Sequence, residues 1–318
     1  MGSEIKVFDR DIKISIIGPG IGDVLMGLGT AHSLADEGIR VSFVAQPKFH
    51  DLIRSCPHVY NVTDIQGKED IWLTAAWHHF QKGHQVDNYN KYCGLFEVDN
   101  NSKSIDIITP VEIQSLMAHQ FPGKDRLVIH PSGRDLGKRW PPEYWQQLID
   151  KFCAEDIEVI SIGMLDWLGT PTYKFDGCIN YLDSPVFETI ELLRHSALLI
   201  SACSGPIQIA GATDCGILGL YSLMPPESRL PYRHGELGWN AKGLMPTCEY
   251  APCFEKMVTP NDFIWSDEAE RRQKEENITL GQLMETWCLN KEAPYSCMTT
   301  ITVDEVFNEA MKLYKANI

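Results

Sequence analysis

Long hydrophobic runs are missing from this sequence. Nowhere in its 318 residues does an apolar stretch approach the roughly 18 to 20 residues needed to span a bilayer. The first residues, MGSEIKVFDRDIK, have no apolar core typical of a secretory signal, so we expect a cytoplasmic protein. Low-complexity segments and short-period repeats are missing as well. These absences argue against a membrane-spanning or exported chain.

Positive charge is scarce. The 28 Lys and Arg residues are outnumbered by 43 Asp and Glu residues, which gives a formal net charge of −15. Duplex nucleic acid or an anionic membrane would be repelled unless basic residues cluster locally. A hydrophobic content of 44% beside 22% charged residues is typical of a soluble globular protein, and the length allows two domains.

The stretch from His130 to Trp145 (HPSGRDLGKRWPPEYW) carries the clearest chemistry. It follows the apolar run Leu127–Ile129, which reads as a short buried strand, and leads into an amphipathic segment that begins with proline. Open α/β folds bind ligands at such strand-to-helix turns. The turn combines flexible backbone, a small hydroxyl and two cations, a set that suits a phosphate: Ser132, Gly133, Gly137, Lys138 and Arg139.

The same turn allows two other interpretations. Gly133–Lys138 looks like a Walker A loop, but only three residues separate the glycines, and Arg139 stands where a Mg²⁺-binding Ser or Thr is required. In a purely structural interpretation, Lys138 and Arg139 are solvated turn cations and Trp140 anchors the core.

The first half opens with a strand, a glycine-rich turn, a helix and a second strand. The strand is expected at Ile12–Ile17, the turn at Gly18–Asp23, the end of the helix near Gly38, and the second strand at Val41–Ala45. A dinucleotide-binding unit is rejected, because the glycines read G-x-G-x-G-D instead of G-x-G-x-x-G and no acid ends the second strand. Asp23 is left with two roles, helix capping or chemistry.

Strands and helices alternate through the rest of the chain, which predicts an α/β protein with two Rossmann-like, doubly wound lobes and a cleft between them. A strand could occupy 71–77, and the connection between lobes is expected at 100–125. His78, His79 and His84 have no Cys or carboxylate at metal-ligand spacing beside them, so surface or structural roles are favoured. The second half is expected to hold helices at 142–154, 185–196 and 205–213, and strands at 158–162, 197–200 and 216–221.

Three motifs occur in one order: Ile21–Leu25 (IGDVL), then Pro131–Gly133 through Lys138–Pro141, then Ser204–Ala210 (SGPIQIA). Together with His84–Asp87 (HQVD), this pattern resembles glycosyltransferase family 9, the heptosyltransferase-like enzymes of the GT-B fold. The resemblance covers about 12 to 255 of the chain and extends to the final helix.

The resemblance implies an inverting transfer of a sugar, such as a heptose, from a nucleotide-diphosphate sugar to an acceptor glycan, lipid or protein. Asp23 matches the general base and Lys138 the cation that faces the donor diphosphate. Gly20 and Gly22 would lie on the acceptor side. The implied donor-binding residues are Ser132, Gly133, Arg139, Ser204, Gly205, Pro206 and Gln208.

The same resemblance implies an order of domains. We expect an acceptor-side lobe at 1–110, a linker at 111–125 and a nucleotide-sugar-binding lobe with a Cys-rich insertion at 126–300. The final helix, at 301–318, should return to the first lobe, as in other GT-B proteins. Its apolar residues recur at helical spacing.

One motif departs from the family. Many members read Asp-Ser/Thr-Gly followed by His, whereas Cys203 replaces the acid here and Gln208 replaces the histidine. Two rival functions therefore stay open: a non-catalytic sugar-nucleotide-binding or scaffold protein on the same fold, and a sugar-nucleotide epimerase.

Ten cysteines in a chain without an export signal favour thiols or metal ligands over disulfides. Four of them fall late: Cys248, Cys253, Cys288 and Cys297. Four thiolates could hold a structural Fe or Zn ion, although their spacing fits no standard zinc finger. Free buried thiols are the alternative. Between them, 261–282 is rich in charge and is expected to be a solvated helix.

Overall fold

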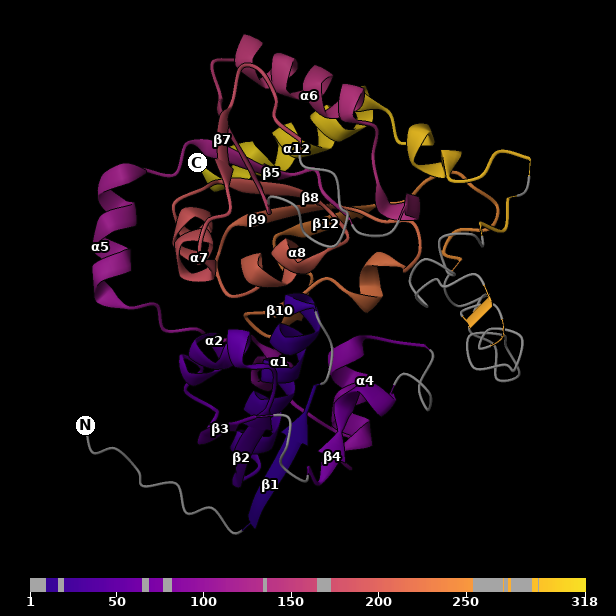
Figure 1. Ribbon diagram of the computed structural model, residues 1–318. Coiled ribbons are helices and arrows are strands. Elements are labelled where there is room, and N and C mark those ends of the chain that lie inside the picture. Colours follow the sequence, from indigo (N-terminus) through magenta and orange to yellow (C-terminus); the bar gives the residue numbers. More distant parts are fainter. Residues whose placement is uncertain are drawn as a thin grey trace.

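The computed structural model describes residues 10–16, 20–64, 69–76, 82–133, 136–164, 173–253, 271, 274–275, 288–290 and 292–318. The chain forms two lobes stacked one on the other, with the first half of the sequence in one and the second half in the other (Figure 1). Within these ranges, no helix is both long enough and apolar enough to cross a bilayer.

The first lobe is built on a parallel sheet of four short strands in the order β3-β2-β1-β4. Because β2 and β4 lie on opposite sides of β1, the turn that follows β1 stands where the strand order reverses. The elements are β1 (Arg10–Ser15), α1 (Ile21–Asp36), β2 (Ile39–Val44), α2 (His50–Arg54), β3 (Asn61–Thr63), β4 (Ile71–Trp72) and α4 (Gln85–Tyr92), with short 3-10 turns at Pro47–Phe49, Leu73–Ala75 and Asn100–Lys103.

The second lobe is built on a parallel sheet of six strands in the order β12-β9-β8-β5-β6-β7, again doubly wound, with its reversal between β5 and β8. Helix α5 (Val111–Gln120) precedes it. Its elements are β5 (Arg126–His130), α6 (Pro142–Ala154), β6 (Glu158–Gly163), β7 (Ile179–Leu182), α7 (Val186–Arg194), β8 (Leu198–Ala202), α8 (Gly205–Ala210), β9 (Gly216–Leu220), β12 (Ala241–Leu244) and α12 (Val303–Asn317), with a hairpin of β10 (Tyr232–Arg233) and β11 (Glu236–Leu237) and 3-10 turns at Leu136–Lys138, Pro226–Ser228 and Ser296–Thr300.

The two faces of the six-stranded sheet have different cores. One face shares a single buried hydrophobic cluster with the first lobe, so Ile14 and Phe43 of the first sheet belong to the same core as Val128 and Leu199 of the second. The other face packs on α6 and α12 around Trp140. The shared core shows that the lobes are closely packed where they meet.

A segment of the second lobe, residues 229–232, packs against the start of α4. We call this segment the strap. His84 Nε2 donates a hydrogen bond to Leu230 O (2.9 Å), while His84 Nδ1 accepts one from Val86 N (3.2 Å). Tyr232 Oη donates to Asp87 Oδ2 at 2.8 Å. The motif His84–Asp87 therefore joins the two lobes through hydrogen bonds.

Several predictions can be compared with this architecture. The two-lobed α/β fold is confirmed, whereas α12 lies on the second lobe, against α6, β8 and β9, and does not return to the first lobe as expected. Its apolar stripe, with Val306 and Ala310 fully buried, covers that sheet face. The expected connection contains helix α5, which packs on α7. His78, His79 and most of 261–282 lie outside the described residues.

Candidate functional site

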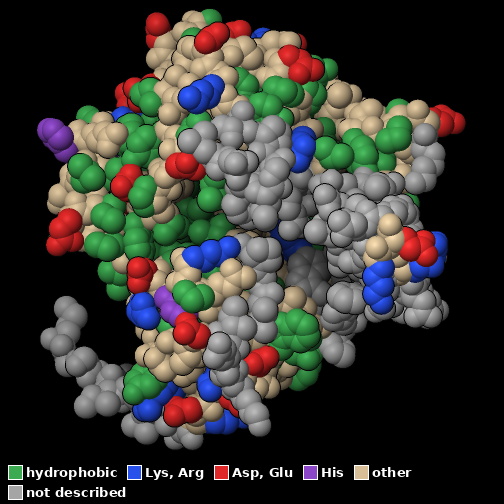
Figure 2. All heavy atoms as spheres, in the orientation of Figure 1, with side chains coloured by type: hydrophobic (Ala, Val, Ile, Leu, Met, Phe, Trp, Pro, Cys, Tyr) green, Lys and Arg blue, Asp and Glu red, His purple; other side chains and the backbone are tan. Residues whose placement is uncertain are grey.

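A cavity of about 680 Å³ lies between the lobes. Figure 2 shows this face of the molecule hollowed where the lobes meet, with hydrophobic side chains on the upper wall. The cavity is within the size range of small-molecule sites. All three sequence motifs reach it, through Gly20–Gly22, Ser132–Gly133 and Ser204–Pro206. They meet because each follows the carboxyl end of a parallel strand at a reversal of strand order.

The first turns of α1 and α8 approach each other at the cavity. A Cβ atom on Gly205 would lie 2.5 Å from Ile21 Cγ2, and one on Gly22 would lie 3.4 Å from Gly205 Cα. Such contact distances leave no room for a side chain at Gly205. The first N–H groups of a helix have no partner inside it and carry partial positive charge, so the start of α1, at the cavity wall, favours an anionic ligand.

Asp23 sits in the first turn of α1, immediately behind the cavity wall. Its Oδ2 atom would lie 3.1 Å from a Cβ on Gly20, which does line the cavity. Asp23 itself is partly exposed and is not among the described lining residues. Only Gly20 therefore lies between the Asp23 carboxylate and the space that a substrate would fill.

Arg229 is a buried cation near Asp23 that the sequence analysis missed. Its side chain is 8% exposed, and its Nη1 donates to Ser228 O (2.8 Å) and to Gln85 Oε1 of the first lobe (3.4 Å). Burial lowers the pKa of Arg229, and the charge of Asp23 acts in the opposite direction. No sequence pattern distinguishes an arginine of this kind from an exposed one.

His130 lines the cavity at the end of β5 and was not singled out as a site residue. Its Nδ1 lies 3.1 Å from Ser204 Oγ and 3.4 Å from Ser201 Oγ. Burial lowers the pKa of His130 to about 4. A neutral imidazole therefore faces the cavity and connects the strand-to-helix turn of β5 with that of β8. Its position at the end of a predicted buried strand is the sequence feature that could have identified it as a site residue.

Lys138 and Arg139 shape the turn after β5. Arg139 Nε donates to Gly133 O at 2.8 Å, and Lys138 Cβ lies 3.5 Å from the position of a Cβ on Gly133. Gly133 lines the cavity, whereas neither cation is among the described lining residues. The structural interpretation of Trp140 is confirmed, because its ring is fully buried and its Nε1 donates to Ile301 O.

The residues at the departing motif are buried. Gln208 is 4% exposed, and its Nε2 donates to Arg229 O at 2.5 Å. Cys203 is 9% exposed at the end of β8. Neither is among the described residues that line the cavity. Gln208 therefore holds the strap that carries Arg229.

The arrangement of the described residues does not support the predicted four-cysteine metal site. The thiols share one region, since Cys248, Cys288 and Cys297 all act on the pKa of Cys253, which burial raises to about 11. The four sulfurs nevertheless do not form a group within 4.8 Å among the described residues. Cys288 Sγ accepts a hydrogen bond from Tyr295 N at 3.2 Å, so this sulfur is engaged in its own turn. All four are free thiols of intermediate exposure.

Two α/β lobes with a cavity between them are the arrangement found in GT-B proteins. No protein-family model matches the chain, and no curated protein matches its sequence. Solved structures do match. The glycosyl transferase family 9 structure from Veillonella parvula has a TM-score of 0.68 at 15% identity and covers 99% of this chain and 100% of its own.

Two further solved structures are similar to this chain. The iron-containing dodecameric glycosyltransferase TibC from enterotoxigenic E. coli gives a TM-score of 0.66 at 13% identity, over 98% of this chain and 78% of that one. The E. coli ADP-heptose LPS heptosyltransferase II gives 0.57 at 13% identity, over 96% and 99%. At such identities the likeness establishes the fold alone, which is the GT-B fold that these structures share.

Proposed function

We propose that this protein is a glycosyltransferase that takes a sugar from a nucleotide-diphosphate sugar bound between its lobes. The observation that carries the proposal is the interlobe cavity, where the three motifs expected to bind the donor and acceptor come together. Structures of the same fold support it, since one of TibC holds ADP-D-β-D-heptose. The expected cytoplasmic location, the domain bounds and the acceptor class stay predictions.

The proposed reaction is a single displacement. The acceptor hydroxyl oxygen bonds to the anomeric carbon as the bond from that carbon to the donor phosphate oxygen breaks. Asp23 takes the hydroxyl proton, and the nucleoside diphosphate leaves with the bonding electrons. Attack from the face opposite the leaving group inverts the anomeric carbon. Lys138 offsets the negative charge that grows on the diphosphate.

Turnover by two variants tests the proposal. Asp23→Asn should lower turnover about 10² to 10⁴-fold because the general base is lost. Lys138→Ala should lower it about 10² to 10³-fold because a preorganised cation is lost. Release of nucleoside diphosphate from a panel of donors and acceptors measures both.

Matched controls come from exposed residues of the same types. Asp51→Asn in α2 and Lys151→Ala in α6 should leave turnover unchanged. Donor conversion without any acceptor would instead indicate an epimerase. If every donor is bound but none is turned over, and Asp23→Asn changes nothing, the protein is a binding or scaffold protein.

A further inference from the structure

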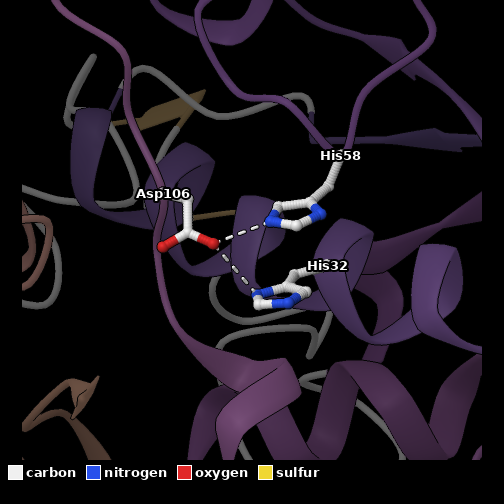
Figure 3. Close-up of side chains that lie close together, drawn as sticks. All are labelled: His32, His58 and Asp106. Carbon is white, nitrogen blue, oxygen red and sulfur yellow. Dashed lines mark hydrogen bonds and ion pairs between the residues drawn. The ribbon is translucent and has the colours of Figure 1, made fainter. Parts of the chain in front are cut away.

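Two histidines and an aspartate meet in the first lobe, outside the interlobe cavity (Figure 3). His32 lies in the middle of α1, His58 lies in the loop after α2, and Asp106 follows the 3-10 turn Asn100–Lys103. One potential ligand atom from each residue lies within 4.8 Å of the other two. The sequence separation of these residues explains why no spacing motif revealed the cluster.

The distances are close to those of a metal centre. His58 Nε2 lies 2.7 Å from Asp106 Oδ2, and His32 Nδ1 lies 3.4 Å from the same oxygen. Ligand atoms about 2.0 to 2.2 Å from one ion lie about 3 to 3.5 Å apart in tetrahedral geometry. The two rings stack at 3.7 Å with an angle of 8° between their planes. A metal–nitrogen bond lies in the ring plane, so binding requires the two planes to tilt apart.

The surroundings of His32 supply the partner that a metal-bound imidazole needs. His32 Nε2 lies 3.4 Å from Asp36 Oδ2, and Ser102 Oγ donates to that same oxygen at 2.6 Å. With its proton on Nε2, His32 turns the lone pair of Nδ1 toward Asp106 and accepts from Ser104 Oγ at 3.2 Å. The other tautomer would donate from Nδ1 to Ser104 O at 3.3 Å. A carboxylate on the outer nitrogen is the usual support of a histidine ligand.

The two imidazoles of the cluster are largely shielded from solvent. The His32 and His58 side chains are 12% and 19% exposed. Burial, followed by the neighbouring His58 ring, lowers the pKa of His32. The hydrogen bond from His58 helps to keep the pKa of Asp106 low. Imidazole and carboxylate are both common ligands of transition metals.

We propose that His32, His58 and Asp106 bind one divalent transition-metal ion such as Zn²⁺ or Fe²⁺. Two imidazoles and one carboxylate suit these ions better than Mg²⁺ or Ca²⁺, which prefer oxygen ligands alone. The ion takes the place of the proton between His58 Nε2 and Asp106 Oδ2, and the neutral His58 ring then carries its proton on Nδ1. Because Asp106 lies on the segment that leads to α5, the ion would fasten this segment to α1.

Cobalt(II) binding to the full chain, stripped of metal with a chelator, tests the proposal. We expect one Co²⁺ per chain with nitrogen and oxygen ligands, seen as visible d–d absorption. Ions held by the cysteines would add sulfur-to-metal charge-transfer bands, so the two kinds of site are distinguishable. Asp106→Asn and His58→Gln should remove the d–d absorption. Asp36→Asn should weaken binding about 10 to 100-fold, because it removes the support of His32.

The matched control is His119→Gln, which changes an exposed histidine of α5 and should bind Co²⁺ like the parent. Far-UV circular dichroism establishes whether each variant is folded. If His58→Gln does not fold, Asp106→Asn still decides the test, because Asp106 is half-exposed and its replacement should be tolerated. The proposal is overturned if the folded parent binds no Co²⁺ with nitrogen and oxygen ligands. It is equally overturned if folded Asp106→Asn binds as tightly as the parent.

Discussion

Arg229 carries a buried positive charge that interacts with Asp23. It comes from the second lobe, contacts Gln85 of the first and lies close enough to Asp23 for their charges to interact. A positive charge nearby favours the ionised form of a carboxylate. Arg229 therefore places a positive charge near the proposed base.

Replacing Arg229 tests this role. In Arg229→Gln, the loss of a nearby positive charge should move the acid limb of the pH–rate profile to higher pH. Arg229→Lys retains the charge and should leave the limb near its parent position. A purely structural arginine would instead lower turnover equally at every pH in both variants, and that outcome would contradict the assignment.

Glycine at the start of α8 decides how closely two helices approach. Gly205 allows the first turns of α1 and α8 to touch, whereas a methyl group there would lie 2.5 Å from Ile21 Cγ2. Overpacking of this kind typically costs about 1 to 3 kcal/mol and pushes the packed elements apart. Because both turns line the cavity, the Gly205→Ala change should distort the site directly.

The parts of the fold that the sequence predicted are those set by short-range patterns. Strand-to-helix turns after β1, β5 and β8 could be predicted because glycines and prolines follow apolar runs, and parallel topology then brings these turns together. The surface on which α12 packs could not be predicted, because an apolar stripe shows that one helix face is buried but not which element buries it. Arg229 and the His32 cluster depend on contacts between distant segments, which leave no local pattern.

Acid should loosen the molecule where its lobes meet. Burial lowers the pKa of His84 to about 4, with Asp87 opposing the shift and Arg229 and Lys103 adding to it. His130 has a similarly lowered pKa. Between about pH 6.5 and about pH 4 the unfolded chain binds more protons than the folded chain, so stability is lost as the pH falls.

The expected loss is about 2 kcal/mol of unfolding free energy for each of these two histidines between about pH 7 and about pH 5. Denaturant unfolding across this range measures it. His84→Gln should lower stability at neutral pH and flatten the pH dependence, whereas His119→Gln should leave the dependence intact. A parent chain equally stable at both pH values would show that neither histidine is held neutral.

Donor binding in the interlobe cavity is the central claim, and calorimetric titration with a panel of nucleotide-diphosphate sugars tests it most directly. We predict that the parent chain binds at least one of them and that Gly205→Ala, while still folded, loses most of that affinity. Adding Ile21→Ala to Gly205→Ala should recover part of it, because the methyl group then has room. If no nucleotide-diphosphate sugar binds the parent, or if Gly205→Ala binds equally well, the cavity is not the donor site.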